Sequence, residues 1–227
     1  MPHQLNWQEI CQMIPKRKAD AQKGDFGRLL CITGSRNMPG ACLLSTQAAL
    51  RGGAGLVTVA TAPENPMRLA AAAPEAMWLP LETDEAGFLR SSDQNRKTLE
   101  KQLSRANAVL LGCGLGVTEE TRRLVHWVLE QAVCPVVLDA DGLNCAVSCI
   151  ELSRRTGKDW ILTPHPGEMA RLTGHSIPQI QENRVETATQ FAAAYPVTLA
   201  LKGAGTLVAQ GSRLAQNPTG NPGMRSE

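Results

Sequence analysis

Short apolar segments alternate along the chain with longer segments in which apolar residues recur every three or four positions. The short segments are rich in Val, Ile and Leu without strict apolar–polar alternation, which is typical of strands buried on both faces of a parallel sheet. They predict eight strands, at 28–33, 56–61, 77–81, 108–112, 135–140, 160–163, 197–202 and 206–210. The longer segments predict helices at 41–51, 65–73, 93–104, 119–131 and 177–194. Strand followed by helix, repeated, indicates an α/β fold with a mostly parallel central sheet flanked by helices.

The last two predicted strands differ from the others because only three residues, 203–205, separate them. So short a connection predicts an antiparallel hairpin. No internal repeat or low-complexity linker interrupts the chain, so the pattern predicts one domain.

Composition narrows the class of protein. A chain of 227 residues can build one substantial core. The net charge of +2 and the absence of a long basic run argue against a nucleic-acid partner. The 7 cysteines form no CxxC pair, so we expect them to serve as small hydrophobic residues in a reduced, cytoplasmic protein. The 4 histidines lack metal-ligand spacing, and no apolar stretch is long enough to cross a membrane.

Two glycine-rich loops follow predicted strands, where ligands of open parallel sheets bind. The loop ITGSRNMPGA, 32–41, has backbone amides that can face a ligand, although a plain turn explains it equally well. It is not a P-loop, because the lysine and hydroxyl residue of that motif are absent. The loop LLGCGLG places Gly112, Gly114 and Gly116 so that a polar group can approach the backbone closely. Helix–strand packing alone would account for one or two of these glycines.

Three further loops carry charged side chains. In VVLDADGLN, either Asp141 caps the next helix, or Asp139 and Asp141 serve metal- or phosphate-linked chemistry. In ILTPHPGEMARL, two prolines hold His165 at a strand end, which favours a functional role over a structural one, and Glu168 lies near a helix amino terminus. In LKGAGT, Lys202 with glycines and a threonine forms a compact anion site or a plain hairpin turn. Together the five loops favour a nucleotide-using α/β enzyme.

These segments, with KGDFGRLLCITGS, AALRGGAGLVTVAT and NPTGNPGM, closely resemble the ADP- or ATP-dependent NAD(P)H-hydrate dehydratases of the ribokinase-like superfamily. The match runs from Lys23 to Met224 in the family's order. The resemblance implies a three-layer ribokinase-like domain over 23–227, preceded by a lead-in over 1–22. It also implies repair of hydrated NADH or NADPH as substrate, with ADP or ATP and Mg²⁺, in a homo-oligomer.

The resemblance also implies roles for individual residues. Those expected to contact the hydrated dinucleotide are Ala41, Gly114, Gly116 and His165. Those expected to bind the nucleotide phosphates are Lys202, Gly203, Ala204, Gly205 and Thr206. Asn144 and Glu168 are expected to position water, metal or phosphate, and no residue is assigned as a metal ligand. Those expected to shape the loop beside the transferred phosphate are Asn217, Thr219 and Asn221. Cys113 stands where the family commonly has proline.

The implied mechanism is phosphorylation of the ring hydroxyl followed by loss of phosphate, which needs a base for the attacking hydroxyl. In the family, a segment of the form GSGD or GTGD follows NPTGNPGM and its aspartate is the base. Here Arg225, Ser226 and Glu227 follow Met224, so no catalytic residue is assigned, and the C-terminal helices of the fold are expected to be missing. Glu227, a terminal residue, is a poorly held substitute. We therefore expect no appreciable turnover from the 227-residue chain.

Two other functions stay open. One is a small-molecule kinase of the same superfamily acting on a vitamin precursor, against which PHPGE and NPTGNPGM argue. The other is a non-catalytic remnant that binds nucleotide without turnover.

Overall fold

The computed structural model describes residues 2–151, 153–154 and 159–221. The chain forms two compact units, a larger unit of Gln22–Trp160 and a smaller unit of Met1–Ala21 with Ile161–Glu227. The division into a lead-in over 1–22 and a domain over 23–227 stays a prediction.

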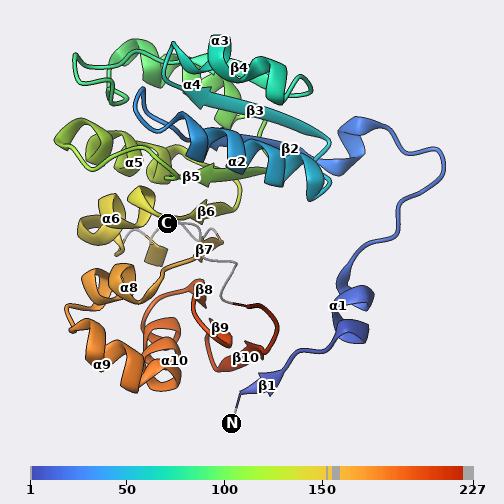
Figure 1. The fold of residues 1–227 in the computed structure, drawn as a ribbon, viewed down its shortest axis with the longest axis vertical. Helices are drawn as coiled ribbons and strands as arrows, with labels where there is room; N and C mark the ends of the chain where they lie inside the picture. The colour runs from blue at the N-terminus through green and yellow to red at the C-terminus, as the bar shows by residue number, and fades with distance from the viewer. Residues whose placement is uncertain (1, 152, 155–158, 222–227) are drawn as a thin grey trace. The chain divides into compact units, whose positions relative to one another are not determined.

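The larger unit is built on a five-stranded parallel sheet in the order β6-β5-β2-β3-β4. Its strands are β2 (Arg28–Ile32), β3 (Leu56–Thr61), β4 (Met77–Pro80), β5 (Ala108–Leu111) and β6 (Val136–Leu138). Its helices are η1 (Lys23–Phe26), α2 (Pro39–Arg51), α3 (Asn65–Leu69), η2 (Ala70–Ala72), α4 (Asp93–Leu103), α5 (Glu119–Gln131), α6 (Asp141–Ala146) and η3 (Val147–Cys149). Figure 1 shows α2 lying along the sheet beside β2.

Helices cover this sheet on both faces because the strands are apolar at successive positions. Cys31 and Val59 belong to the cluster that packs under α2 with Cys42. Leu30 and Thr58, which alternate with them, line a hollow with Gln102 of α4 on the opposite face. A sheet covered on both faces favours apolar residues at successive strand positions, and most positions of β2 and β3 are apolar.

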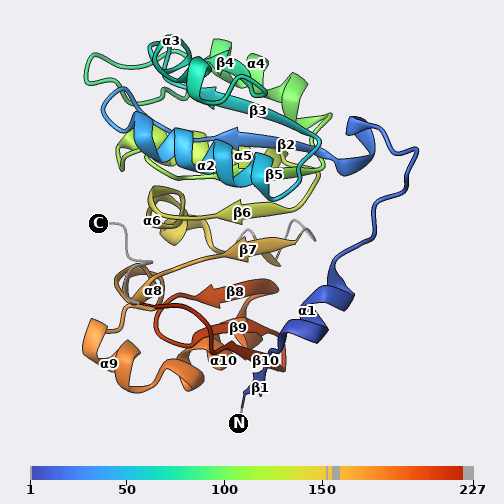
Figure 2. The same ribbon diagram turned by 45° about the vertical axis from the view of Figure 1, so that its right-hand side comes forward.

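The smaller unit has a mixed sheet. Its strands are β1 (His3–Gln4), β7 (Trp160–Leu162), β8 (Val197–Leu201), β9 (Thr206–Gln210) and β10 (Arg213–Asn217). Its helices are α1 (Trp7–Met13), α8 (Pro166–Thr173), α9 (Ile177–Glu182) and α10 (Arg184–Ala194). Strands β8 and β9 pair antiparallel, as predicted, β10 pairs antiparallel with β9, and β1 pairs parallel with β10. Figure 2 shows α10 beside β8 and β9.

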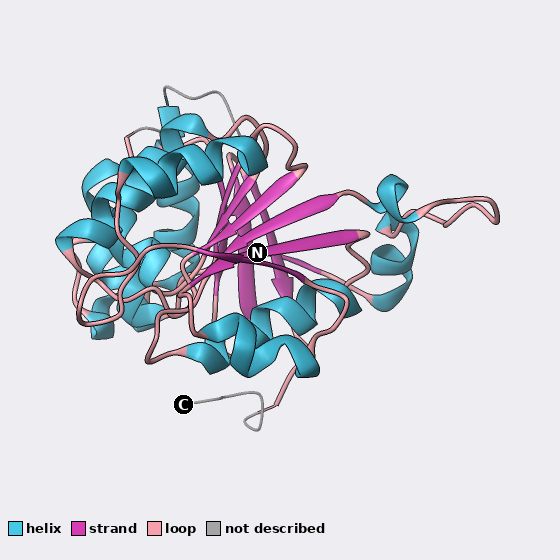
Figure 3. Ribbon diagram, turned by 90° about the horizontal axis from the view of Figure 1, so that it is seen from above, coloured by secondary structure: helices cyan, strands magenta, loops and turns pink. Residues whose placement is uncertain are grey.

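The structure confirms an α/β fold with a mostly parallel sheet flanked by helices, and Figure 3 shows helices lying against the strands. All eight predicted strands are present, with ends shifted by at most two residues. The single helix predicted over 177–194 is wrong: Asn183, with φ −121° and ψ 37°, separates α9 from α10. Within the described residues, no helix is long and apolar enough to span a bilayer.

Most of the cysteines are small residues of the core, as the composition predicts. None of the seven, all of which lie in the described residues, forms a disulfide, and five of them are buried: Cys31, Cys42, Cys134, Cys145 and Cys149. Burial raises the pKa of the Cys31 thiol to about 12 and that of Cys149 to about 11, from an ordinary 9.0. These thiols are therefore core residues rather than nucleophiles.

The raised thiol pKa values predict a loss of stability in alkali. Above pH 9.0 the unfolded thiols release protons that the folded ones retain, so the free energy of unfolding falls as pH rises. Each such thiol contributes a slope of about 1.4 kcal/mol per pH unit. Urea unfolding between pH 9 and 11 measures it, and Cys31→Ala is expected to remove one thiol's share of the slope, whereas Cys11→Ala, at an exposed site, is expected to leave it unchanged. Equal slopes in wild type and Cys31→Ala would contradict this account.

Candidate functional site

The two glycine-rich loops of the larger unit lie side by side. The loop after β2 donates from Gly34 N to the Cys113 carbonyl at 2.8 Å and from Ser35 N to the Gly114 carbonyl at 2.7 Å. A methyl group at Gly114 would lie 2.7 Å from Cβ of Ala41, and Gly114 has φ +69°. The structure thus brings together Ala41 and Gly114, which the family resemblance implies are both contacts of the dinucleotide. Gly114 itself is buried, and its role in binding stays a prediction.

Ser35 is a polar residue that the sequence reasoning did not single out. It is 1% exposed, and its Oγ atom has no hydrogen-bond partner among the described residues. Its backbone amide joins the two loops, so the unused hydroxyl lies at their junction. A buried polar group without a partner is costly, and a ligand or a water at this junction would satisfy it.

The interpretation of Asp141 as a helix cap is wrong. Ala140 is the N-cap of α6, and Asp141 is its first residue. The Asp141 carboxylate accepts a hydrogen bond from Gly116 N at 2.8 Å, while the Gly116 carbonyl accepts one from Thr121 Oγ1 at 2.9 Å. Both backbone polar groups of Gly116 are therefore used within the protein, and its predicted contact with substrate stays a prediction.

The other residues of this segment have protein partners as well. The Cys113 thiol lies 3.6 Å from Asp139 Oδ2, and the Asn144 carbonyl accepts from Arg122 Nη1 at 3.3 Å. In the described part of the chain, no three His, Cys, Asp or Glu side chains gather as they would around a metal ion.

Ala140 has φ 50° and ψ −121°, a backbone conformation that favours glycine. Because an alanine there costs of order 1–3 kcal/mol, we expect Ala140→Gly to raise the free energy of unfolding by about 1 kcal/mol. Chemical denaturation measures the change. A lower stability in Ala140→Gly would show that the local strain is smaller than the extra chain entropy of glycine.

In the smaller unit, His165 caps α8. Its Nδ1 accepts from Gly167 N at 2.9 Å and Glu168 N at 3.3 Å, so the ring proton of the neutral imidazole lies on Nε2. In return, Glu168 Oε2 accepts from His165 N at 2.8 Å, which completes a capping box. The structure therefore gives His165 a structural role, and its predicted contact with substrate stays a prediction.

Lys202 joins this pair at the end of β8. Its amide donates to the Pro164 carbonyl at 2.8 Å, and its ammonium nitrogen lies 3.9 Å from Glu168 Oε2. The Glu168 side chain is only 5% exposed, whereas that of Lys202 is 41% exposed. A buried carboxylate thus anchors an ammonium group whose tip reaches solvent, an arrangement that suits an incoming anion.

Residues 203–205 form the turn between β8 and β9, and Thr206 Oγ1 donates to the Gly203 carbonyl at 3.1 Å. Arg184, which the sequence did not reveal as a site residue, donates from Nη1 to the Ala204 carbonyl at 2.6 Å. Its position in the sequence, in a polar helical segment, carries no signal of that contact. The loop is therefore stabilised by Arg184 of α10 as well as by the hydrogen bond within the hairpin.

Strand β10 leads the chain past this loop. Asn217 pairs with Thr206, and its Oδ1 accepts from Thr219 N at 3.1 Å and Thr219 Oγ1 at 2.8 Å. Asn221 is the last described residue. Residues 222–227, which include Met224 and the terminal Glu227, lie outside the described residues.

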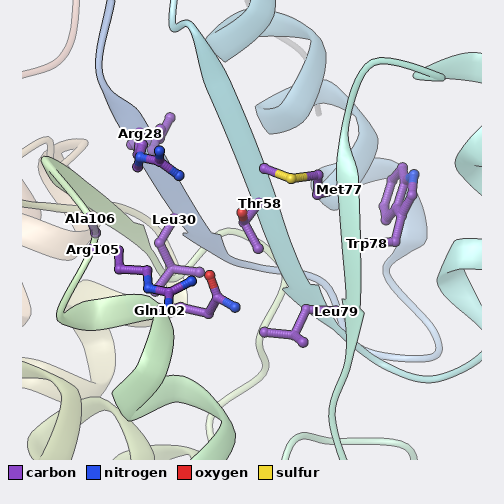
Figure 4. A pocket seen from close by; sticks show the side chains of 10 residues that line it. Arg28, Leu30, Thr58, Met77, Trp78, Leu79, Gln102, Arg105 and Ala106 are labelled. Carbon is purple, nitrogen blue, oxygen red and sulfur yellow. The ribbon is translucent and has the colours of Figure 1, made fainter. Parts of the chain in front are cut away.

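A hollow of about 250 Å³ lies elsewhere in the larger unit, and Figure 4 shows its lining. It is formed by β2, β3 and β4 with the end of α4, and Leu30, Thr58 and Met77 line it. None of the predicted site residues lines this hollow. The candidate site is therefore formed by the loops that follow the strands.

Comparison with known proteins identifies the family that the loop sequences resemble. A family model described as NAD(P)H-hydrate dehydratase matches residues 29–226. A bifunctional NAD(P)H-hydrate repair enzyme Nnr from Coxiella burnetii is 39% identical over 221 residues, which are 97% of this chain and 42% of that protein. The chain thus spans less than half the length of this curated relative.

Solved structures give the same result. The ADP/ATP-dependent NAD(P)H-hydrate dehydratase from Bacillus subtilis, co-crystallised with ATP and Mg²⁺, is similar with a TM-score of 0.78 at 30% identity, over 97% of this chain and 74% of that one. A ribokinase-like superfamily protein from Enterococcus faecalis has a TM-score of 0.80 at 26% identity, over 98% of this chain and 73% of that one. The fold is ribokinase-like, and the chain belongs to the NAD(P)H-hydrate dehydratase family.

Proposed function

We propose that this chain acts in the nucleotide-dependent dehydration of hydrated NADH and NADPH, a repair of damaged cofactors. The observation that carries the proposal is the Lys202 ammonium, held 3.9 Å from the buried Glu168 carboxylate at the start of a glycine loop. Family membership supports it, since the family model carries the name of this activity.

The smaller unit supplies the nucleotide half. Lys202 provides charge, and residues 203–206 provide backbone amides and a hydroxyl for the phosphates. The structural relative from Bacillus subtilis is named as ADP/ATP-dependent, which supports ADP or ATP as the nucleotide. Asn217, Thr219 and Asn221 would shape the chain next to this loop.

Mg²⁺ would enter with the nucleotide. It usually keeps several waters and binds through one or two carboxylates plus substrate phosphates, so it needs no dedicated protein cage. Among the described residues, no three His, Cys, Asp or Glu side chains form such a cage. When bound, the ion neutralises charge on the phosphates; Asn144 and Glu168 are the candidates for positioning it or the water around it.

The larger unit supplies the dinucleotide half. Ala41, Gly114 and Gly116 belong to the two glycine-rich loops that lie side by side, and we assign the dinucleotide to these loops. The Ser35 hydroxyl, which has no hydrogen-bond partner among the described residues, adds a hydrogen-bonding group where the loops meet. The family resemblance implies His165 as a further contact of the dinucleotide. Binding by backbone and small residues suits a flat nicotinamide ring that must approach the chain closely.

The chemistry proceeds in two balanced steps. The hydroxyl oxygen added to the ring bonds to the terminal phosphorus of the nucleotide, the bond to the leaving nucleotide oxygen breaks, and a base accepts the hydroxyl proton. The ring carbon–oxygen bond then breaks, phosphate leaves with the electron pair, and loss of a neighbouring ring proton restores the double bond. Lys202 stabilises charge in the first step, and no described residue is assigned as the base.

A cytoplasmic location and a homo-oligomer stay predictions.

The reaction is tested with hydrated NADH and ADP or ATP, by following recovery of reduced-nicotinamide absorbance. The protein is this chain extended by the aspartate-bearing segment and helices that the family places after NPTGNPGM. We expect recovery that requires both nucleotide and Mg²⁺. Phosphorylation of an unrelated alcohol without recovery would favour the vitamin-precursor kinase, and binding of nucleotide without either reaction would favour the non-catalytic remnant.

A further inference from the structure

Arg184, the first residue of α10, gathers the carbonyl groups of the glycine loop around its guanidinium. Nη1 donates to the Ala204 carbonyl at 2.6 Å, and Nη2 donates to the Leu201 carbonyl at 3.1 Å. Nη2 also lies 3.4 Å from the carbonyls of Lys202 and Gly205. One side chain therefore contacts four of the five residues from 201 to 205.

The charge of this guanidinium is not paired within the described residues. No ion pair there involves Arg184, and burial lowers the pKa of its guanidinium. Its Nε atom is buried without a hydrogen-bond partner. A cation held only by carbonyl dipoles leaves a net positive charge under the loop, which favours an anion on the loop's outer side.

Peptide geometry sets the direction of the loop amides. In a trans peptide the carbonyl of one residue and the amide of the next point in opposite directions. Because the carbonyls of Lys202 and Ala204 point at Arg184, the amides of Gly203 and Gly205 point away from it. Gly203 and Ala204 are exposed, so this outer side is accessible to solvent.

The loop sequence fits this contact. Gly203 has φ +144°, and a methyl group there would lie 3.0 Å from Nη2 of Arg184. Only glycine combines that backbone conformation with room for the guanidinium.

We infer that Arg184 is the positioning residue of the nucleotide loop: it turns the loop carbonyls inward so that the amides of Gly203 and Gly205 face the phosphates. That the loop binds a nucleotide rests on the proposed function, whereas the ordering of the loop by Arg184 does not. Arg184 touches no phosphate itself in this scheme; it acts through the loop and through its charge.

The test compares Arg184→Met, which keeps the apolar stem, with Arg184→Lys, which keeps the charge. Arg213→Met is the matched control, because Arg213 is an exposed arginine of the same unit. Without nucleotide, hydrogen exchange of the Lys202 amide, which donates to the Pro164 carbonyl, reports loop order, and titration calorimetry with ADP reports binding. In Arg184→Met we expect exchange in this loop to quicken by roughly tenfold or more, since the loop opens locally. We expect the Kd for ADP to rise by roughly 10- to 100-fold, and Arg184→Lys to recover part of both.

Three results separate the parts of the inference. Unchanged loop exchange in Arg184→Met overturns the positioning role. Faster exchange spread evenly over the smaller unit also overturns it, because that pattern marks a general loss of stability. If wild-type protein does not bind ADP while loop exchange responds as expected, the positioning role is supported and the nucleotide assignment is overturned.

Discussion

Lys202→Met is expected to weaken binding of ADP and ATP by roughly 100-fold, measured by titration calorimetry. The ammonium is the charged group at the head of the glycine loop, and hydrogen bonds to phosphate from a charged donor are about twice as strong as neutral ones. The variant also leaves the buried Glu168 carboxylate without the cation 3.9 Å away, so a lower thermal stability is expected as well.

The matched control for Lys202 is Lys18→Met, which removes the same charge from an exposed position of the smaller unit. It is expected to leave nucleotide affinity unchanged. The interpretation fails if Lys202→Met retains wild-type affinity under conditions in which circular dichroism shows it to be folded.

Gly114→Ala is expected to weaken binding of hydrated NADH by roughly 100-fold and to lower the free energy of unfolding by about 1–2 kcal/mol. The new methyl group lies 2.7 Å from Cβ of Ala41 and 3.1 Å from Cβ of Met38, so the loop that carries MPGA must shift. The positive φ of Gly114 adds strain for any residue with a Cβ atom.

Gly24→Ala serves as the control for Gly114, because a methyl group at Gly24 meets nothing within 4 Å. Neither substitution changes the charge of the larger unit, so a difference in dinucleotide affinity between them is caused by the change in the Gly114 loop. Wild-type affinity for hydrated NADH in a folded Gly114→Ala protein would contradict the assignment of this loop pair.

Much of the fold could be predicted because its signal is local. The larger unit's strands are apolar runs buried on both faces, and α5 begins and ends at the predicted residues, Glu119 and Gln131, under a Thr118 cap. Strand β10 was not predicted because its sequence, RLAQN, has little apolar character, and it forms through pairing with β9. Likewise β1 has two residues and depends on β10 for its hydrogen bonds. Tertiary pairing of this kind leaves no periodic pattern in the sequence.

The candidate site was predictable in part for a similar reason. Glycine-rich and proline-flanked segments after strands are visible in the sequence, and the structure places two of them against each other through Ser35 and Gly114. Contacts between these loops and side chains of other elements could not be predicted from the sequence. Arg184 reaches its loop from a helix 17 to 21 positions away in the chain, and Asp141 bonds Gly116 across two elements.

The most direct test of the central claim, that one chain carries separate determinants for nucleotide and for hydrated dinucleotide, is a pair of calorimetric titrations on three proteins. ADP and hydrated NADH are each titrated into wild type, Lys202→Met and Gly114→Ala. We predict that wild type binds both ligands, that Lys202→Met loses mainly ADP, and that Gly114→Ala loses mainly hydrated NADH. Failure of folded wild-type protein to bind either ligand, or equal loss of both ligands in both variants, would contradict it.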